Sequence, residues 1–169
     1  LRWFLSLTIV ATLICGICLF SQSNQEHLSV ETNFRHALFQ VVSTITTTGY
    51  ASADYGLWPH VTWGVLGILM FTGSCAGSTT GGFKMVRVVM LTKNAYNEFK
   101  HILHPNAILP IRVNDTVISN SLKSTLLAFF YIYIFLIAVS TLLFTFMGLG
   151  FSESAGLSLS CISNIGPAF

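Results

Sequence analysis

The feature that most constrains this 169-residue chain is the placement of its charges, which leaves long stretches with none. Residues 3–20 are uncharged, and so are the 29 positions 55–83 and the 29 positions 124–152. About 20 mainly apolar residues are enough for a helix to cross the roughly 30 Å of hydrocarbon in a bilayer. Only 8% of the chain is charged, against about 25% in a soluble domain, which is too little to cover a water-exposed surface. The sequence therefore predicts an all-α protein that crosses a lipid bilayer three times.

Basic residues gather between the second and third predicted spans. The segment 84–123 holds Lys84, Arg87, Lys93, Lys100, Arg112 and Lys123. Because cytoplasmic loops keep Lys and Arg, we expect residues 84–123 to be cytoplasmic, and the segments after the first and third spans to face outside. Asp54 and Glu153 would then lie outside, either concentrating cations or as ordinary solvated charges.

Two further apolar stretches are too short to span a bilayer. Residues 34–46 run into Thr-Thr-Thr-Gly-Tyr, and residues 154–162 run into Ser-Asn-Ile-Gly-Pro. Stretches of this length favour re-entrant or interfacial helices, for which Thr32 or Asn33 and Ser152 are candidate N-caps.

The two short stretches also repeat. A shift of 117 residues pairs Phe34 with Phe151, Ser43 with Ser160, Ile45 with Ile162 and Gly49 with Gly166. We therefore predict one unit of span, short pore helix, filter turn and broken span in residues 1–90. A basic cytoplasmic loop follows in residues 91–120, and a second unit in residues 121–169 stops at its turn, so we expect the chain to be a fragment.

The two glycine turns are the candidate ion site. Irregular backbone inside a membrane is tolerated when it faces a watery cavity, and its carbonyls can replace the hydration shell of a cation. Glycine permits the positive φ that turns a carbonyl inward. The candidate filter residues are Thr46, Thr47, Thr48, Gly49, Ser163, Asn164, Ile165 and Gly166. The alternative is a Thr-rich turn that only closes an external loop.

The stretch 55–83 is too long for one span, since a continuous helix would extend roughly 43 Å. Its lower part, residues 73–82, has no large apolar side chain. One interpretation is a flexible gate loop beneath the filter, formed by Gly73, Ser74, Gly77, Ser78, Thr79, Thr80, Gly81 and Gly82. The other is close helix packing through glycines spaced four apart. The adjacent Gly81 and Gly82 slightly favour a break in the helix.

Other chemistries are poorly supported. Residues 77–84 lack the hydroxyl residue that completes a phosphate-binding loop, because Met85 follows Lys84. Ser74 and Ser78 have no histidine in the first or third span to act as a base. The pairs His101/His104 and Cys15/Cys18 lack the further ligands of a zinc site. We expect no enzyme activity and no nucleic-acid partner.

Four segments, in this order, resemble the TrkH-type potassium uptake proteins of the Trk/Ktr/HKT superfamily. They are residues 46–50, residues 73–84 (Gly-Ser-Cys-Ala-Gly-Ser-Thr-Thr-Gly-Gly-Phe-Lys), residues 104–107 (His-Pro-Asn-Ala) and residues 163–167. The glycine-serine-threonine run before Lys84 is the most specific of them. The chain departs from the family pattern at Thr79, Thr80 and Ala168, where glycine is common.

The resemblance implies a fold of four repeats around one potassium pathway, of which this chain would supply the third and the start of the fourth. It implies K⁺ as the transported ion, held at Thr47, Thr48, Asn164 and Ile165, with no bound cofactor. It also implies a bacterial inner membrane location, a homodimer and a cytosolic nucleotide-binding regulatory subunit. The competing hypothesis is a membrane scaffold whose glycine run only packs helices. If the glycines form a filter, serine at a filter glycine should change ion selectivity and spare expression, whereas a bulky residue at a glycine that packs helices should lower expression.

Overall fold

The computed structural model describes residues 2–22, 30–75, 77–103, 112–113, 116–117 and 120–167, and the statements below concern these ranges. The elements are α1 (Arg2–Gln22), α2 (Val30–Ile45), the 3-10 helix η2 (Tyr55–Leu57), α3 (His60–Thr72), α4 (Met85–Leu103), β1 (Arg112–Val113), β2 (Thr116–Val117), α5 (Asn120–Phe146) and α6 (Phe151–Ser163). Helices dominate, as the sequence predicts, and β1 and β2 form a two-residue antiparallel pair. Ala76, residues 104–107 and Ala168 lie outside the described residues.

Two helices are long and apolar enough to cross a membrane, at Arg2–Ser21 in α1 and at Ser121–Phe146 in α5. They correspond to the first and third uncharged stretches. The middle stretch is different, because its apolar helix α3 has only 13 residues and ends at Thr72. Helix resumes at Met85 in α4. The middle stretch is therefore a broken helix.

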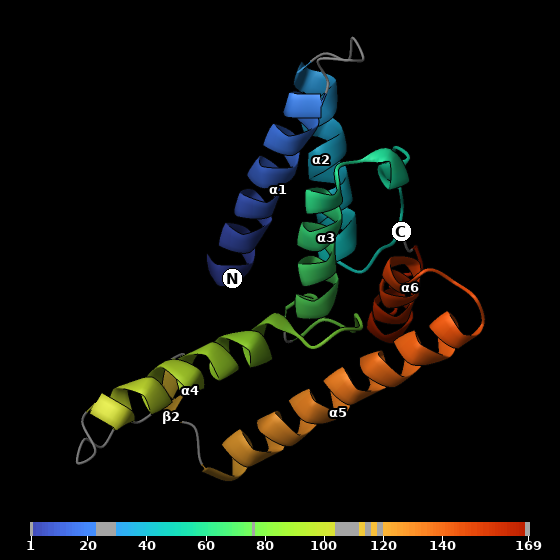
Figure 1. The fold of residues 1–169 in the computed structure, drawn as a ribbon. Coiled ribbons are helices and arrows are strands. Elements are labelled where there is room, and N and C mark those ends of the chain that lie inside the picture. Colours follow the sequence, from blue (N-terminus) through green and yellow to red (C-terminus); the bar gives the residue numbers. More distant parts are fainter. Residues whose placement is uncertain are drawn as a thin grey trace.

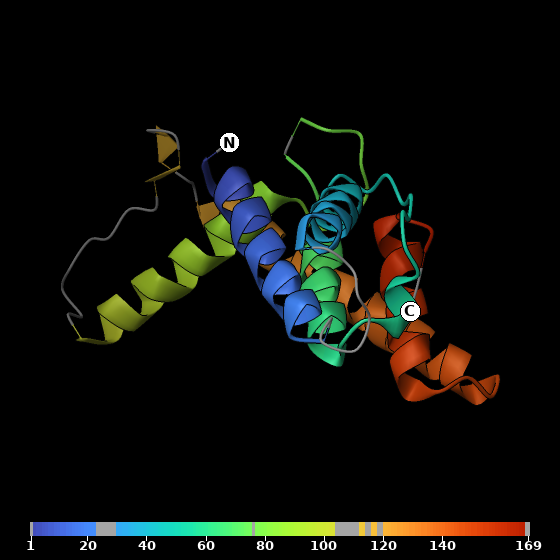
Figure 2. The ribbon, with the colours of Figure 1, turned by 90° about the horizontal axis from the view of Figure 1, so that it is seen from above.

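The helices pack as two neighbouring groups (Figure 1). In the first, α1 and α2 lie side by side and α3 contacts both. Their shared core contains Cys15, Val41 and Leu66, all with no exposed surface. In the second, α6 packs along α5 and also contacts α3, which joins the groups. The short helices α2 and α6 are thus each held beside a long helix. Helix α4 extends to one side, away from α2 and α6 (Figure 2).

The outward faces of α1 and α5 are apolar. Ile9, Ile17, Tyr131 and Phe135 are each more than half exposed. A soluble monomer rarely leaves so much contiguous apolar surface in water, and hydrocarbon-facing helices require it. This exposure fits the bilayer predicted from the uncharged stretches.

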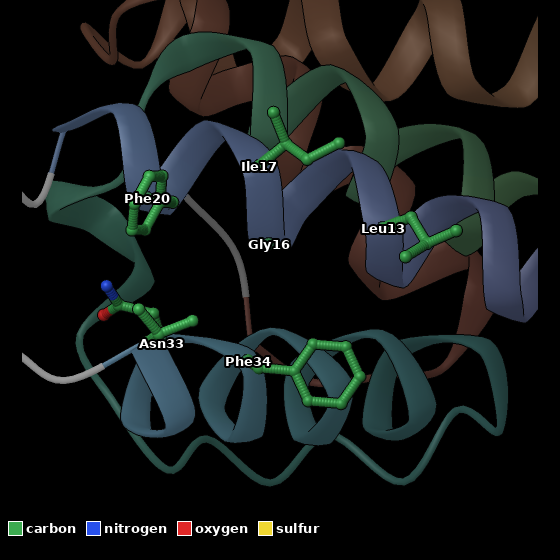
Figure 3. Close-up of a pocket in the computed structure, with 7 residues that line it drawn as sticks. Leu13, Gly16, Ile17, Phe20, Asn33 and Phe34 are labelled. Carbon is green, nitrogen blue, oxygen red and sulfur yellow. The ribbon is translucent and has the colours of Figure 1, made fainter.

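A groove of about 330 Å³ separates the ends of α1 and α2 (Figure 3). Its lining is apolar apart from the Asn33 side chain, and it includes Leu13, Ile17, Phe20 and Phe34. The Asn33 amide nitrogen is buried without a hydrogen-bond partner. The groove lies at the end of α2 opposite its glycine turn, so it takes no part in the site described below.

Both cap predictions are wrong. Helix α2 begins at Val30, so Thr32 and Asn33 lie inside it. Helix α6 begins after Gly150, which makes no side-chain cap, and Ser152 is its second residue. The predictions placed each helix start at its apolar stretch, whereas helical backbone begins earlier. An acidic residue in each first turn, Glu31 or Glu153, favours that earlier start through the helix dipole.

Candidate functional site: two glycine turns and a broken helix

The first glycine turn follows α2 through a Schellman motif. The Thr48 amide donates to the Ser43 carbonyl at 2.9 Å, and the Thr47 amide donates to the Thr44 carbonyl at 3.1 Å. Thr47 takes the left-handed conformation, with φ of 53°. These bonds satisfy carbonyls that would otherwise lack partners at the helix end.

The second glycine turn follows α6 with the same backbone pattern. The Ile165 amide donates to the Ser160 carbonyl at 3.0 Å, and the Asn164 amide donates to the Cys161 carbonyl at 3.1 Å. Asn164 is left-handed, with φ of 54°. Donors and acceptors correspond one to one to those of the first turn under the 117-residue shift. The repeat that is thin in sequence identity is therefore present in the backbone hydrogen bonds.

Beyond each Schellman motif the backbone carbonyls have no backbone donor. Among the hydrogen bonds between described backbone groups, none ends on a carbonyl of residues 46–49 or of residues 163–166. Gly49 and Gly166 have φ of 79° and 107°, so each turn bends through a glycine where other residues are strained. Each turn therefore offers several carbonyl oxygens that have no backbone donor within the described residues.

The two turns touch. A Cβ atom added at Gly49 would lie 2.0 Å from the Ile165 carbonyl oxygen and 3.0 Å from the Pro167 ring. The chain leaving α2 passes beside the C-terminal end of α6 (Figure 1 and Figure 2). The structure thus brings together the two sets of candidate filter residues, which are 117 positions apart in sequence.

The glycine-serine-threonine run is a loop that folds back on itself. Gly73 ends α3 with φ of 61° and ψ of −167°, a conformation open essentially to glycine alone. The Phe83 amide donates to the Phe71 carbonyl at 3.2 Å, and the Met85 amide donates to the Ser74 carbonyl at 3.1 Å. Of the two interpretations of this run, the structure has the broken helix.

This loop lies against the second glycine turn. A Cβ atom at Gly81 would be 2.0 Å from the Ser163 carbonyl oxygen and 3.0 Å from the Asn164 Cβ. At Gly77 an added Cβ would meet nothing within 4 Å. The glycines that share a four-residue spacing therefore differ in role, and Gly81 makes the close approach.

Lys84 holds the loop from within, a role that sequence reasoning missed. Its ammonium donates to the Ser78 carbonyl at 2.8 Å, to the Thr80 hydroxyl at 3.1 Å and to the Thr80 carbonyl. From the sequence we placed Lys84 in the basic cytoplasmic segment and at the end of the family motif, but we did not predict a bond to its own loop. A lysine two positions after a glycine-rich run is the signal that could have indicated it.

An aromatic cluster, also missed, packs beside the loop and the second turn. It consists of Phe71, Phe83, Phe129, Phe130 and Tyr133. Phe83 is fully buried at its centre, and the Arg87 guanidinium lies 4.0 Å from the centre of the Phe129 ring. The cluster thereby fixes the end of the loop to α5.

Of the two charges predicted to lie outside, Asp54 has a local structural role. The Asp54 carboxylate accepts a hydrogen bond from the Gly56 amide, with 3.1 Å between nitrogen and oxygen, and so caps η2. Burial, and to a lesser degree Asp54, raises the pKa of Tyr55, so its phenol stays neutral. Glu153 is exposed in the first turn of α6.

The described residues contain no group of three potential metal ligands. Cys15 and Cys18 are free cysteines, and His104 lies outside the described residues. The zinc-site alternative weighed at those positions therefore gains no support from the described part of the chain.

The model of the TrkH family of cation transport proteins matches residues 2–169. The chain belongs to this family. The Trk system potassium uptake protein TrkH of Halomonas elongata is 30% identical over 158 residues, which cover 92% of this chain and 32% of that protein. TrkG of Escherichia coli K12 is 32% identical over 137 residues, which cover 81% of this chain and 28% of that protein.

A solved structure agrees in fold. The crystal structure of the potassium transporter TrkH from Vibrio parahaemolyticus matches with a TM-score of 0.89 at 29% identity. The match covers 99% of this chain and 35% of that one. The chain thus spans about a third of the length of the relatives it matches, which are named as transporters and not as enzymes.

Proposed function

We propose that this chain contributes two filter segments and one gate loop to a potassium pathway across a bacterial inner membrane. The observation that carries the proposal is the contact between the two glycine turns, each with carbonyls that lack backbone donors. Carbonyls without backbone donors, at the negative ends of two short helices, are the kind of groups that replace water around a cation. Thr47, Thr48, Asn164 and Ile165 are the positions where we expect K⁺ to bind.

Residues 73–82 act as the gate in this proposal. Their loop approaches the second turn at Gly81, and the Lys84 ammonium organises the loop carbonyls. A loop with its own internal hydrogen bonds can take two arrangements without unfolding the helices on either side. Potassium as the cargo is supported by relatives that are named potassium uptake proteins.

The remaining assignments follow from the charges and the family. We propose that α1 and α5 span the bilayer, that α3 with its loop forms a broken span, and that α2 and α6 are re-entrant pore helices. Residues 84–123 then face the cytoplasm. A homodimer and a cytosolic nucleotide-binding subunit are further proposals.

The test is rubidium and sodium flux into proteoliposomes that contain the complete gene product carrying residues 1–169. Gly166→Ser is the informative variant, because an added Cβ would meet nothing within 4 Å among the described residues. Its cost is then limited to the backbone strain of a side chain at a φ of 107°. We expect a flux that prefers rubidium over sodium in the parent protein. In Gly166→Ser at matched insertion, the preference should fall about tenfold, which is the effect of about 1.4 kcal/mol.

Gly77→Ser is the matched control, since its position is also open but lies away from both turns. Its rubidium preference should equal that of the parent. A folded parent protein without cation flux, even with its cytosolic subunit added, would favour the scaffold hypothesis, in which the glycine run only packs helices.

A further inference from the structure

The hydroxyl of Tyr133 is placed against the second glycine turn. Tyr133 lies on α5, and its phenol oxygen is 2.8 Å from the hydroxyl of Ser163, the last residue of α6. Ser163 has no exposed surface, and Tyr133 is 6% exposed. The Ser163 carbonyl is the one that faces Gly81 of the loop. Ser163 thus connects the helix α5, a candidate filter turn and the loop.

The pairing is specific among the buried serines of α6. Ser154, Ser158 and Ser160 are fully buried, and their hydroxyls have no hydrogen-bond partner among the residues that the structure describes. A buried serine on this helix is therefore not enough to have a tyrosine as its hydrogen-bond partner. The partner is found at Ser163, where the helix gives way to the turn.

Packing fixes the direction in which the phenol points. The Tyr133 ring meets Phe71 edge to face at 5.4 Å between ring centres, and Phe83 at 5.8 Å. Phe129 lies against it at 6.3 Å. A ring held on several sides cannot swing its hydroxyl away from Ser163 without disturbing the aromatic cluster.

We propose that Tyr133 is a positioning residue for ion selectivity, which sets the geometry of residues 163–166 through the Ser163 hydroxyl. This inference rests on the function proposed above. Carbonyls in a filter discriminate between cations through their number and spacing, so a turn that loses its anchor should discriminate less well. Tyr133 need not touch the ion.

The experiment compares Tyr133→Phe with the parent in the complete gene product, reconstituted in proteoliposomes. The substitution removes the hydroxyl and keeps the ring, so the aromatic cluster stays filled. We expect the ratio of rubidium to sodium flux to fall about fivefold, as the loss of one buried hydrogen bond would allow. A role limited to folding would lower the thermal unfolding midpoint and leave that ratio unchanged.

Ser160→Ala is the matched control. It removes a hydroxyl from a fully buried serine of the same helix that has no partner, and we expect its flux ratio to match the parent. Ser163→Ala approaches the bond from the other side and should reproduce the effect of Tyr133→Phe. The double variant should be no worse than either single variant, because both remove the same interaction.

The outcomes separate the two proposals. A selective parent with an unchanged ratio in Tyr133→Phe or in Ser163→Ala overturns the role of Tyr133 and leaves the proposed function standing. A parent without potassium-like selectivity overturns both. If Tyr133→Phe does not fold, the Ser163→Ala ratio decides alone.

Discussion

The two glycine turns share one backbone and differ in what holds it. In the first turn the bracing bonds are local, since the Ser43 hydroxyl donates to the Tyr50 carbonyl at 2.6 Å and the hydroxyls of Thr46 and Thr48 lie 2.8 Å apart. In the second turn the bracing is tertiary. Ser163 is held by Tyr133 from α5, and its carbonyl is covered by Gly81 from the loop.

The difference shows that a repeated backbone does not require repeated side chains. The Schellman bonds fix each turn through main-chain atoms, so the residues around them are free to diverge. A locally braced turn keeps its shape when distant segments move. A turn braced by another helix and by a loop changes with them, and for this reason we expect the gate loop to act on the second turn more than on the first.

The largest effect should come from putting serine at the two turn glycines. At Gly49 a Cβ would lie 2.0 Å from a backbone oxygen, whereas at Gly166 it would be in open space. We expect Gly49→Ser to cost at least about 3 kcal/mol of folding free energy, because backbone must shift in addition to the strain at positive φ. Gly166→Ser should cost about 1 kcal/mol.

The measurement is the thermal unfolding midpoint in detergent, together with the folded yield. From the sequence, serine at either candidate filter glycine was expected to spare expression. The geometry supports that expectation for Gly166 and opposes it for Gly49. Equal losses in the two variants would contradict the close approach of the first turn to Ile165.

An intermediate effect should follow from a methyl group at Gly81. An added Cβ there would displace the loop or the Ser163 carbonyl, at 2.0 Å separation. We expect Gly81→Ala to raise the basal cation flux about tenfold. That change corresponds to a loss of about 1.4 kcal/mol in the free energy that favours the closed position of the loop. Rubidium flux without added regulators, measured in proteoliposomes, is the readout.

Gly64→Ala is the control for that experiment, because Gly64 lies in α3 outside the loop and its Cβ would meet nothing within 4 Å among the described residues. Its basal flux should stay at the parent level. A flux that rises equally in both variants would mean that the contact between Gly81 and the second turn is not what closes the loop.

Much of the fold follows from the sequence because its causes are local. The absence of charge locates α1 and α5, and the shift of 117 residues relates α2 to α6. The small residues of 73–82 disfavour a continuous helix, and the helix indeed ends at Thr72. These features depend on neighbouring residues and on solvent, which a single chain displays directly.

The side-chain contacts of the site were harder to predict from the sequence. Tyr133 is 30 residues from Ser163, and nothing in the neighbouring sequence distinguishes it from the other aromatic residues of the apolar helix α5. The bond of Lys84 to its own loop was hidden by the simpler explanation of a basic cytoplasmic residue. Both depend on how helices pack after the loop has folded, which residue spacing does not encode.

The smallest effect should come from exchanging the left-handed residues of the two turns. Thr47 and Asn164 occupy equivalent positions with φ of 53° and 54°, but a β-branched side chain is strained there and asparagine is tolerated. Thr47→Asn should therefore raise stability by about 0.5 kcal/mol, and Asn164→Thr should lower it by a similar amount. If ions bind the backbone carbonyls, the rubidium to sodium ratio of Thr47→Asn will match the parent, because the φ of the turn is retained. A ratio that falls while the unfolding midpoint rises would instead assign the Thr47 hydroxyl to the ion, and the two turns would then differ in their ligands as well as in their bracing.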